Sequence, residues 1–173
     1  MSVSLVVRPV TLTWANYTEK DKVVDPADNT EQAAFTAFDF DLPGGKTRAI
    51  DGEVALPDDQ QLIITPVALI RKDVRKSDEL LSHEQFHYDV AIVIGRVVVS
   101  KLDRLRGRSA ADLDVASDQL LTLHFQVRAG LIQRRYDLET HHGRNTHYQK
   151  AWKKLMRETM ARPDSTQMGG WWL

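Results

Sequence analysis

The sequence predicts an α+β fold, in which an N-terminal antiparallel sheet packs on one long helix and two further helices follow. Three observations favour this class. Apolar and polar residues alternate with a period of two before residue 76, apolar positions recur at helical spacing after residue 77, and Pro, Gly and Asp gather between the alternating runs. We expect the 173 residues to form one domain, with mainly strands at 1–76, mainly helices at 77–162 and an irregular tail at 163–173.

The first predicted strands are the alternating runs at 10–14 and 38–42. The segments "DPADNT", "LPGG" and "LPDD" predict turns, because Pro fixes φ while Gly and Asp accept unusual backbone angles. The run "QLIITPVALI" is the last predicted strand. Pro66 cannot donate a ladder hydrogen bond, so we expect residues 62–69 to form an edge strand or to contain a bulge.

The first helix is expected to begin after Ser77, an N-cap followed by two acidic residues, and to run to about Gly107. The run "AIVIGRVVVS" is rich in β-branched residues, whose propensity favours a strand. We predict a helix there for two reasons. His83 and His87 share a face only on a helix, and an apolar run interrupted only by Arg96 suits a helix buried on nearly all sides.

A second helix is predicted from Ser109 to about His142, where Gly143 is the expected breaker. Its predicted apolar stripe comprises Leu113, Ala116, Leu120, Leu123, Val127 and Leu131. A third helix is expected to start at the capping sequence "THYQ", with Trp152 on its apolar side and a basic, solvated opposite face. In the tail, Trp171 and Trp172 are expected to dock on the domain or on a partner.

Composition narrows the classes of function. The 23 basic and 24 acidic residues give a net charge of −1, which argues against nucleic acid as a partner. Without cysteine, only His, Asp and Glu remain as strong metal ligands. No segment approaches the roughly 20 apolar residues of a membrane span, and the N-terminus lacks an export pattern. As written, the sequence predicts a cytoplasmic protein; a periplasmic or secreted one is the alternative if a signal peptide has been trimmed.

The pentapeptide "HEQFH" at residues 83–87 carries the chemistry. His83 and His87, four residues apart on a helix, project from one face and can chelate one zinc ion. Glu84 lies about 100° further around the helix, where it can reach a water on the metal rather than the metal itself. The pattern favours zinc-dependent hydrolysis with Glu84 as general base. The alternative is a charged helix turn that has the same sequence by chance and no function.

The segment "YDLETHHGRNTHY" offers the richest set of further ligands: Asp137, Glu139, His141, His142 and His147. His124, among apolar neighbours, is a weaker candidate. The predicted stabilisers of a transition state are Tyr136, His141, His147 and Tyr148. Asp89 is predicted either to orient a ligand His or to form a helix-to-sheet hydrogen bond.

The blocks "LLSHEQFHYDVA" and "YDLETHHG", followed by "YQKAW", resemble a bacterial family of predicted zinc-dependent proteases that carry His-Glu-Gln-x-His-Phe-Asp and Tyr-Asp-x-Glu-Thr-x-His-Gly. Tyr88 replaces the usual Phe after the second His. The resemblance implies a zincin-like arrangement with His83 and His87 as zinc ligands and Glu84 as base. By position in "THHG" it also implies His142 as third ligand, with His141 or Asp137 as alternatives.

We therefore expect a zinc metallopeptidase of the HExxH type that acts on a peptide or protein. The alternative is a non-catalytic protein-binding domain on a similar scaffold, with a structural metal or none. Zinc-dependent hydrolysis of a different ester or amide is a third class, because the same activated water attacks those bonds.

Overall fold

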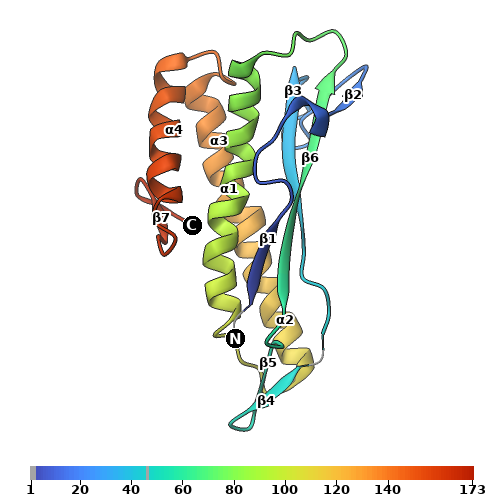
Figure 1. The fold of residues 1–173 in the computed structure, drawn as a ribbon, viewed down its shortest axis with the longest axis vertical. Helices are drawn as coiled ribbons and strands as arrows, with labels where there is room; N and C mark the ends of the chain where they lie inside the picture. The colour runs from blue at the N-terminus through green and yellow to red at the C-terminus, as the bar shows by residue number, and fades with distance from the viewer. Residues whose placement is uncertain (1–2, 46) are drawn as a thin grey trace.

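The computed structural model describes residues 3–45 and 47–173 and contains a sheet with helices packed against it (Figure 1). The mixed α/β class, the N-terminal sheet and the three helical segments agree with the prediction. The strands are β1 (Ser4–Val7), β2 (Thr18–Lys20), β3 (Ala34–Asp41), β4 (Arg48–Ile50), β5 (Glu53–Ala55), β6 (Gln61–Arg71), β7 (Gln167–Met168) and β8 (Trp171–Trp172). The helices are η1 (Trp14–Asn16), α1 (Asp78–Leu102), α2 (Ala110–Leu121), η2 (Thr122–Arg128), α3 (Ala129–Thr140) and α4 (Thr146–Met160).

The main sheet is mixed, so the prediction of an antiparallel sheet was wrong. Strand β6 is its centre: β1 runs parallel to the first half of β6, from Ser4 opposite Gln61, and β2 runs parallel to its end, from Thr18 opposite Leu69. Strand β3 pairs antiparallel with β6 along its whole length. The expectation that residues 62–69 form an edge strand is therefore also wrong, and the edges belong to β3 on one side of β6 and to β1 and β2 on the other.

Pro66 is tolerated inside this central strand because of a gap in the pairing. Pro66 lies opposite Phe38 of β3. On the other side of β6, the register with β1 ends at Ile64 and the register with β2 begins at Leu69. The missing N–H of Pro66 thus falls where no neighbouring strand needs a donor. At this one point β6 is open on one side, as an edge strand would be.

The predicted strand at 10–14 was also wrong, because this stretch leads into the short helix η1. The side-chain amide oxygen of Asn16 accepts from the backbone N–H of Thr13 at 2.8 Å, and the backbone N–H of Leu12 donates to Gln85 of α1 at 2.7 Å. Local side-chain acceptors take the backbone donors that a strand would have offered to a neighbour.

Helix α1 lies between the sheet and α4 (Figure 1) and contains the β-branched run, as predicted. Ser77 is its N-cap, since the Ser77 hydroxyl accepts from the backbone N–H of Leu80 at 3.2 Å. The helix ends at Leu102, earlier than expected. Tertiary burial overrides propensity here: Val90, Ile94 and Val98 have no exposed surface. At Gly95, a Cβ would lie 2.7 Å from a methyl of Ile64, so glycine permits the close approach of helix and sheet.

The second helical segment is continuous over α2, η2 and α3 but turns a different face to the core than predicted. Residues 122–128 form a π-helical stretch. Leu113, Ser117, Leu121, Phe125 and Ala129 are all buried, at steps of four. In an α-helix of 3.6 residues per turn, positions four apart move gradually around the helix and would leave the core side. The π-helical turn contains more residues, so it brings these positions back to the core side. Three members of the predicted stripe are consequently 43–47% exposed: Leu123, Val127 and Leu131.

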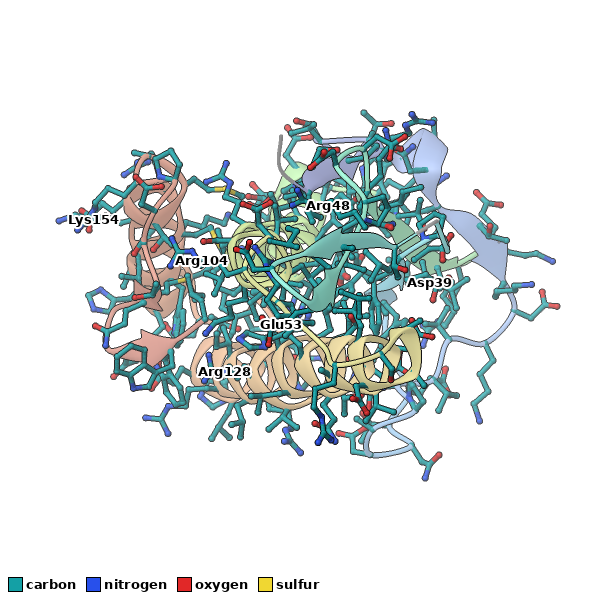
Figure 2. The ribbon with its side chains drawn as sticks, turned by 90° about the horizontal axis from the view of Figure 1, so that it is seen from below. Asp39, Arg48, Glu53, Arg104, Arg128 and Lys154 are labelled. Carbon is teal, nitrogen blue, oxygen red and sulfur yellow. The ribbon has the colours of Figure 1, made fainter. Side chains whose placement is uncertain are left out.

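The cap of helix α4 lies one residue earlier than predicted: Asn145, rather than Thr146, accepts from the backbone N–H of Tyr148, and Thr146 is the first helical residue. Trp152 is buried as expected, while Lys154 projects away from the domain (Figure 2). In the tail, β7 and β8 form a small hairpin that buries Met168 and leaves Trp172 60% exposed. No helix in residues 3–45 and 47–173 is long and apolar enough to cross a membrane.

His124 lies in the core, which supports its interpretation as a core histidine. Its burial should make the stability of the folded protein depend on pH. Burial lowers the pKa of His124 below its ordinary value of 6.5, and the charges of Arg128 and Lys101 act in the same direction. Below pH 6.5 the unfolded chain therefore takes up a proton before the folded one does, and stability falls as the pH falls. We expect His124→Gln to lose less stability than wild type between pH 7 and pH 5 in urea unfolding. Equal losses would contradict this role.

Candidate metal centre

Helix α1 delivers three buried polar side chains to one place. His83, Glu84 and His87 are 3%, 4% and 8% exposed. The two imidazoles lie one turn apart, and their Nε2 atoms are 3.3 Å from each other. As the spacing predicted, both rings project from the same side of the helix.

Asp137 of α3 completes a group of three ligand atoms. Its Oδ1 atom lies 3.2 Å from Nε2 of His83 and 3.0 Å from Nε2 of His87. Donor atoms about 2.0–2.1 Å from one ion in a tetrahedral arrangement lie roughly 3.3 Å from one another. The separations in this group fit that requirement, so His83, His87 and Asp137 could hold a metal ion.

Electrostatics support the same interpretation. The Oδ1 atom of Asp137 is buried and accepts no hydrogen bond of adequate geometry within the described chain, although both Nε2 atoms are close. Burial acts to raise the pKa of Asp137, but the imidazoles of His87 and His83 outweigh it and hold that pKa below its ordinary value. Burial acts to lower the pKa of His87, and the Asp137 carboxylate outweighs it. A cation bound between these atoms would satisfy all three.

Aromatic packing sets the position of Asp137. The neighbouring Tyr136 is fully buried and stacks on Phe86 and His83 of α1, with ring centroids 3.8 and 4.8 Å apart. Trp152 of α4 contacts Tyr136 and donates to Glu139 at 2.7 Å, which joins α4 to α3. With Tyr136 fixed in the core, the next residue along α3, Asp137, lies against the two histidines.

The turn after α3 brings His142 to the edge of the group. His141, His142 and Gly143 all have positive φ, at 49°, 53° and 82°. The side chain of His142 is half exposed, and its Nδ1 atom lies 3.9 Å from Asp137 Oδ1. The structure thus brings Asp137, the predicted alternative, into the ligand triangle and places His142, the preferred third ligand, beside it.

Gly143 is required in this turn for two reasons. Its φ of 82° is unfavourable for residues with a Cβ, and a Cβ there would lie 3.1 Å from Cγ of His83. The backbone therefore packs directly on the ring of His83. The predicted breaker of the second helix is also a wall of the candidate site.

A cleft of about 730 Å³ opens over the group. One wall comprises residues of the loop 25–33 and the start of β3, and the other comprises residues of η2, α3 and the turn 142–144. His83, Glu84, His87, Asp137 and His142 all line it. The ligand triangle is therefore open to a molecule larger than water.

The other predicted site residues lie elsewhere. Among the described residues, the cleft lining does not include Asp89, Tyr136, Glu139, His141, His147 or Tyr148. Asp89 accepts from Gln85 at 2.7 Å instead of orienting a histidine. Tyr136 is sealed in the core, and His147 and Tyr148 are exposed at the start of α4.

Sequence reasoning missed a pair of hydroxyl groups, one of which, that of Thr36, belongs to a residue lining the cleft. The Tyr17 phenol and the Thr36 hydroxyl lie 2.8 Å apart and are buried. Thr36 lies in an alternating strand, where a buried threonine gives no signal of its own, and its partner Tyr17 lies in a stretch for which no element was predicted.

Comparisons of the chain with protein-family models, with curated proteins and with solved structures found no match.

We expect Asp137→Asn to weaken zinc binding at least about 100-fold, since altering even the groups that orient a ligand costs 10- to 100-fold. His142→Ala should bind zinc close to wild type, because the triangle of ligand atoms does not contain it. Competition titration with a chromogenic chelator measures both. The reverse order of effects would make His142 the third ligand.

Gly143→Ala should both destabilise the protein, by about 1 to 3 kcal/mol, and weaken zinc binding, because the new methyl displaces His83. Gly170→Ala is the matched control: its φ is also positive, at 91°, but a Cβ there meets nothing within 4 Å. We expect the control to lose stability in thermal unfolding without any change in zinc affinity. Equal zinc affinity in both variants would contradict the contact with His83.

Proposed function

We propose that this protein is a zinc-dependent hydrolase of peptide bonds. The observation that carries the proposal is the triangle of His83, His87 and Asp137 at the base of an open cleft, with Glu84 next to the first ligand on the same helix. The resemblance of "HEQFHYD" and "YDLETHHG" to predicted zinc proteases supports it, since both blocks contribute ligands to the triangle. We also propose a zincin-like relation for the sheet and α1.

Each side chain has a separate role in this proposal. His83, His87 and Asp137 would hold the ion, and zinc would supply a Lewis acid that acidifies a bound water and polarises a carbonyl. Glu84 accepts the proton of the attacking water and returns it to the leaving amine. The Asp137 carboxylate would neutralise one of the two positive charges of a bound zinc ion.

Strand β3 favours an extended peptide as substrate. Within the part of the chain that the structure describes, β3 pairs only with β6, so its second edge is free of strands. Residues 33–36 line the cleft at the same point as the ligand triangle. A substrate could add along β3 through backbone hydrogen bonds. This edge replaces the one that we had expected at β6.

The second candidate is a non-catalytic domain with a closed metal site. The position of His142, 3.9 Å from Asp137 Oδ1, favours it, because a fourth protein ligand would leave no place for water. X-ray absorption of the zinc-loaded protein separates the two cases. Three protein ligands and a light oxygen atom support hydrolysis, whereas three imidazoles and one carboxylate support a structural site.

We expect Glu84→Gln to keep zinc and to lower kcat about 100-fold or more, since general-base catalysis contributes about 10²–10⁴. Glu79→Gln is the control, because Glu79 lies one turn earlier on α1 and lines the same cleft. It should retain activity. Digestion of a peptide library with mass-spectrometric detection provides the substrate and the rates. Full activity in the Glu84 variant would remove the proposed base.

A further inference from the structure

Glu84 contains a buried oxygen that lacks a hydrogen-bond donor. Its side chain is among the most buried charged groups of the protein, at 4% exposed. The Oε2 atom accepts no hydrogen bond from any described residue. A buried carboxylate oxygen without a donor is costly, so a partner is expected on the side to which this atom points.

That side is the interface between α1 and the sheet. On a helix, residues 84, 88 and 95 share one face. Tyr88 donates from that face to the carbonyl of Ile64 in β6, and Gly95 packs there against Ile64 and Leu5. Glu84 thus points toward the sheet, while His83 and Phe86 point toward α3 and stack with Tyr136.

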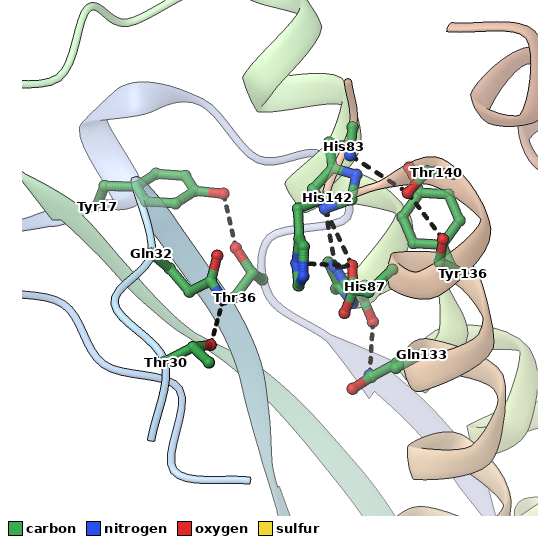
Figure 3. A network of polar contacts seen from close by, with 12 residues as sticks. Tyr17, Thr30, Gln32, Thr36, His83, His87, Gln133, Tyr136, Thr140 and His142 are labelled. Carbon is green, nitrogen blue, oxygen red and sulfur yellow. Dashed lines mark hydrogen bonds and ion pairs between the residues drawn. The ribbon is translucent and has the colours of Figure 1, made fainter. Parts of the chain in front are cut away.

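The Tyr17–Thr36 hydroxyl pair lies on the sheet at this interface. Thr36 shares the helix-facing side of β3 with Phe38 and Phe40, which contact Phe125 of η2. Thr36 and Glu84 line the same cleft, and Figure 3 shows the pair facing the histidines. The pKa of Tyr17 is raised, first by burial and then by the negative charge of Glu84, so the phenol and the carboxylate are within electrostatic reach of each other.

The hydroxyl pair has a hydrogen-bond donor to spare, and the Glu84 carboxylate lacks one. Two hydroxyls carry two protons, and their mutual hydrogen bond uses one. One proton of the pair remains to be donated, and Glu84 Oε2 needs a donor. No direct hydrogen bond joins Glu84 Oε2 to the hydroxyl pair among the described residues. One bridging water could accept from the hydroxyl pair and donate to the carboxylate.

We propose that Tyr17 and Thr36 are positioning residues that fix the Glu84 carboxylate through one bridging water. The inference rests on the proposed function, in which Glu84 is the base. In this arrangement the two hydroxyls hold Oε2 of Glu84 on the sheet side, and the second carboxylate oxygen of Glu84 faces the cleft. The Tyr136 hydroxyl is also buried without a partner, and the Glu84 charge contributes to raising its pKa, so a bond from Tyr136 to Oε2 is the outcome that would refute the bridge.

A crystal structure of the full chain with zinc, at a resolution that shows ordered water, tests the bridge without any activity assay. We expect a water within hydrogen-bond distance of Glu84 Oε2 and of the Tyr17–Thr36 pair, and we expect it to be lost or displaced in Thr36→Val. A wild-type structure in which Oε2 bonds to another group, or contacts no water, overturns the proposal. This result stands even if the protein hydrolyses no peptide, which would refute only the proposed function.

Kinetics on the peptide found by library digestion test the consequence. Tyr17→Phe and Thr36→Val should lower kcat about tenfold, as removal of supporting hydrogen bonds does at other metal sites. The KM and the zinc content should stay near wild type, and Thr36→Ser should restore kcat because it restores the hydroxyl. Unchanged kcat in both hydroxyl-free variants, or a loss that Thr36→Ser does not restore, overturns the positioning role.

Discussion

The stacking of Tyr136 between Phe86 and His83 is the interaction on which the candidate site depends. It fixes α3 against α1, and the adjacent Asp137 side chain therefore lies against the two imidazoles. A cluster of two histidines and one carboxylate is unfavourable inside a protein unless a cation or protons compensate it. The apolar and aromatic contacts around it therefore stabilise an arrangement that the polar groups alone would not adopt.

The π-helical stretch at 122–128 is the second requirement. It keeps Leu121, Phe125 and Ala129 on the core side and delivers α3 in the rotation that buries Tyr136. π-Helical turns are uncommon because their hydrogen-bond geometry is poor, and they occur often beside functional sites. The two histidines with positive φ at the end of α3 add a further local strain, held by the hydrogen bond from His142 N–H to the Asp137 carbonyl.

The sheet contributes the other half of the cleft. Because β6 is central, β3 keeps a free edge, and its buried Thr36 hydroxyl bonds to Tyr17, which precedes β2 on the other side of β6. Strand β3 contacts helix α1, which carries Glu84. The catalytic base of the proposed hydrolase thus lies between two kinds of neighbour: metal ligands toward α3 and neutral hydroxyls toward the sheet.

Local sequence patterns were enough to predict the α1 helix with its Ser77 cap, the shared face of His83 and His87, the end of the second helix shortly before Gly143 and the strand around Phe38. These follow from capping chemistry and periodicity, which act over a few residues. The folded structure was needed to reveal the central place of β6, the buried face of α2 to α3, the position of Asp137 beside the two histidines and the Tyr17–Thr36 pair. Strand order, helix rotation and the meeting of side chains from different segments depend on packing between residues far apart in the chain, and a single sequence carries no local signal of that packing.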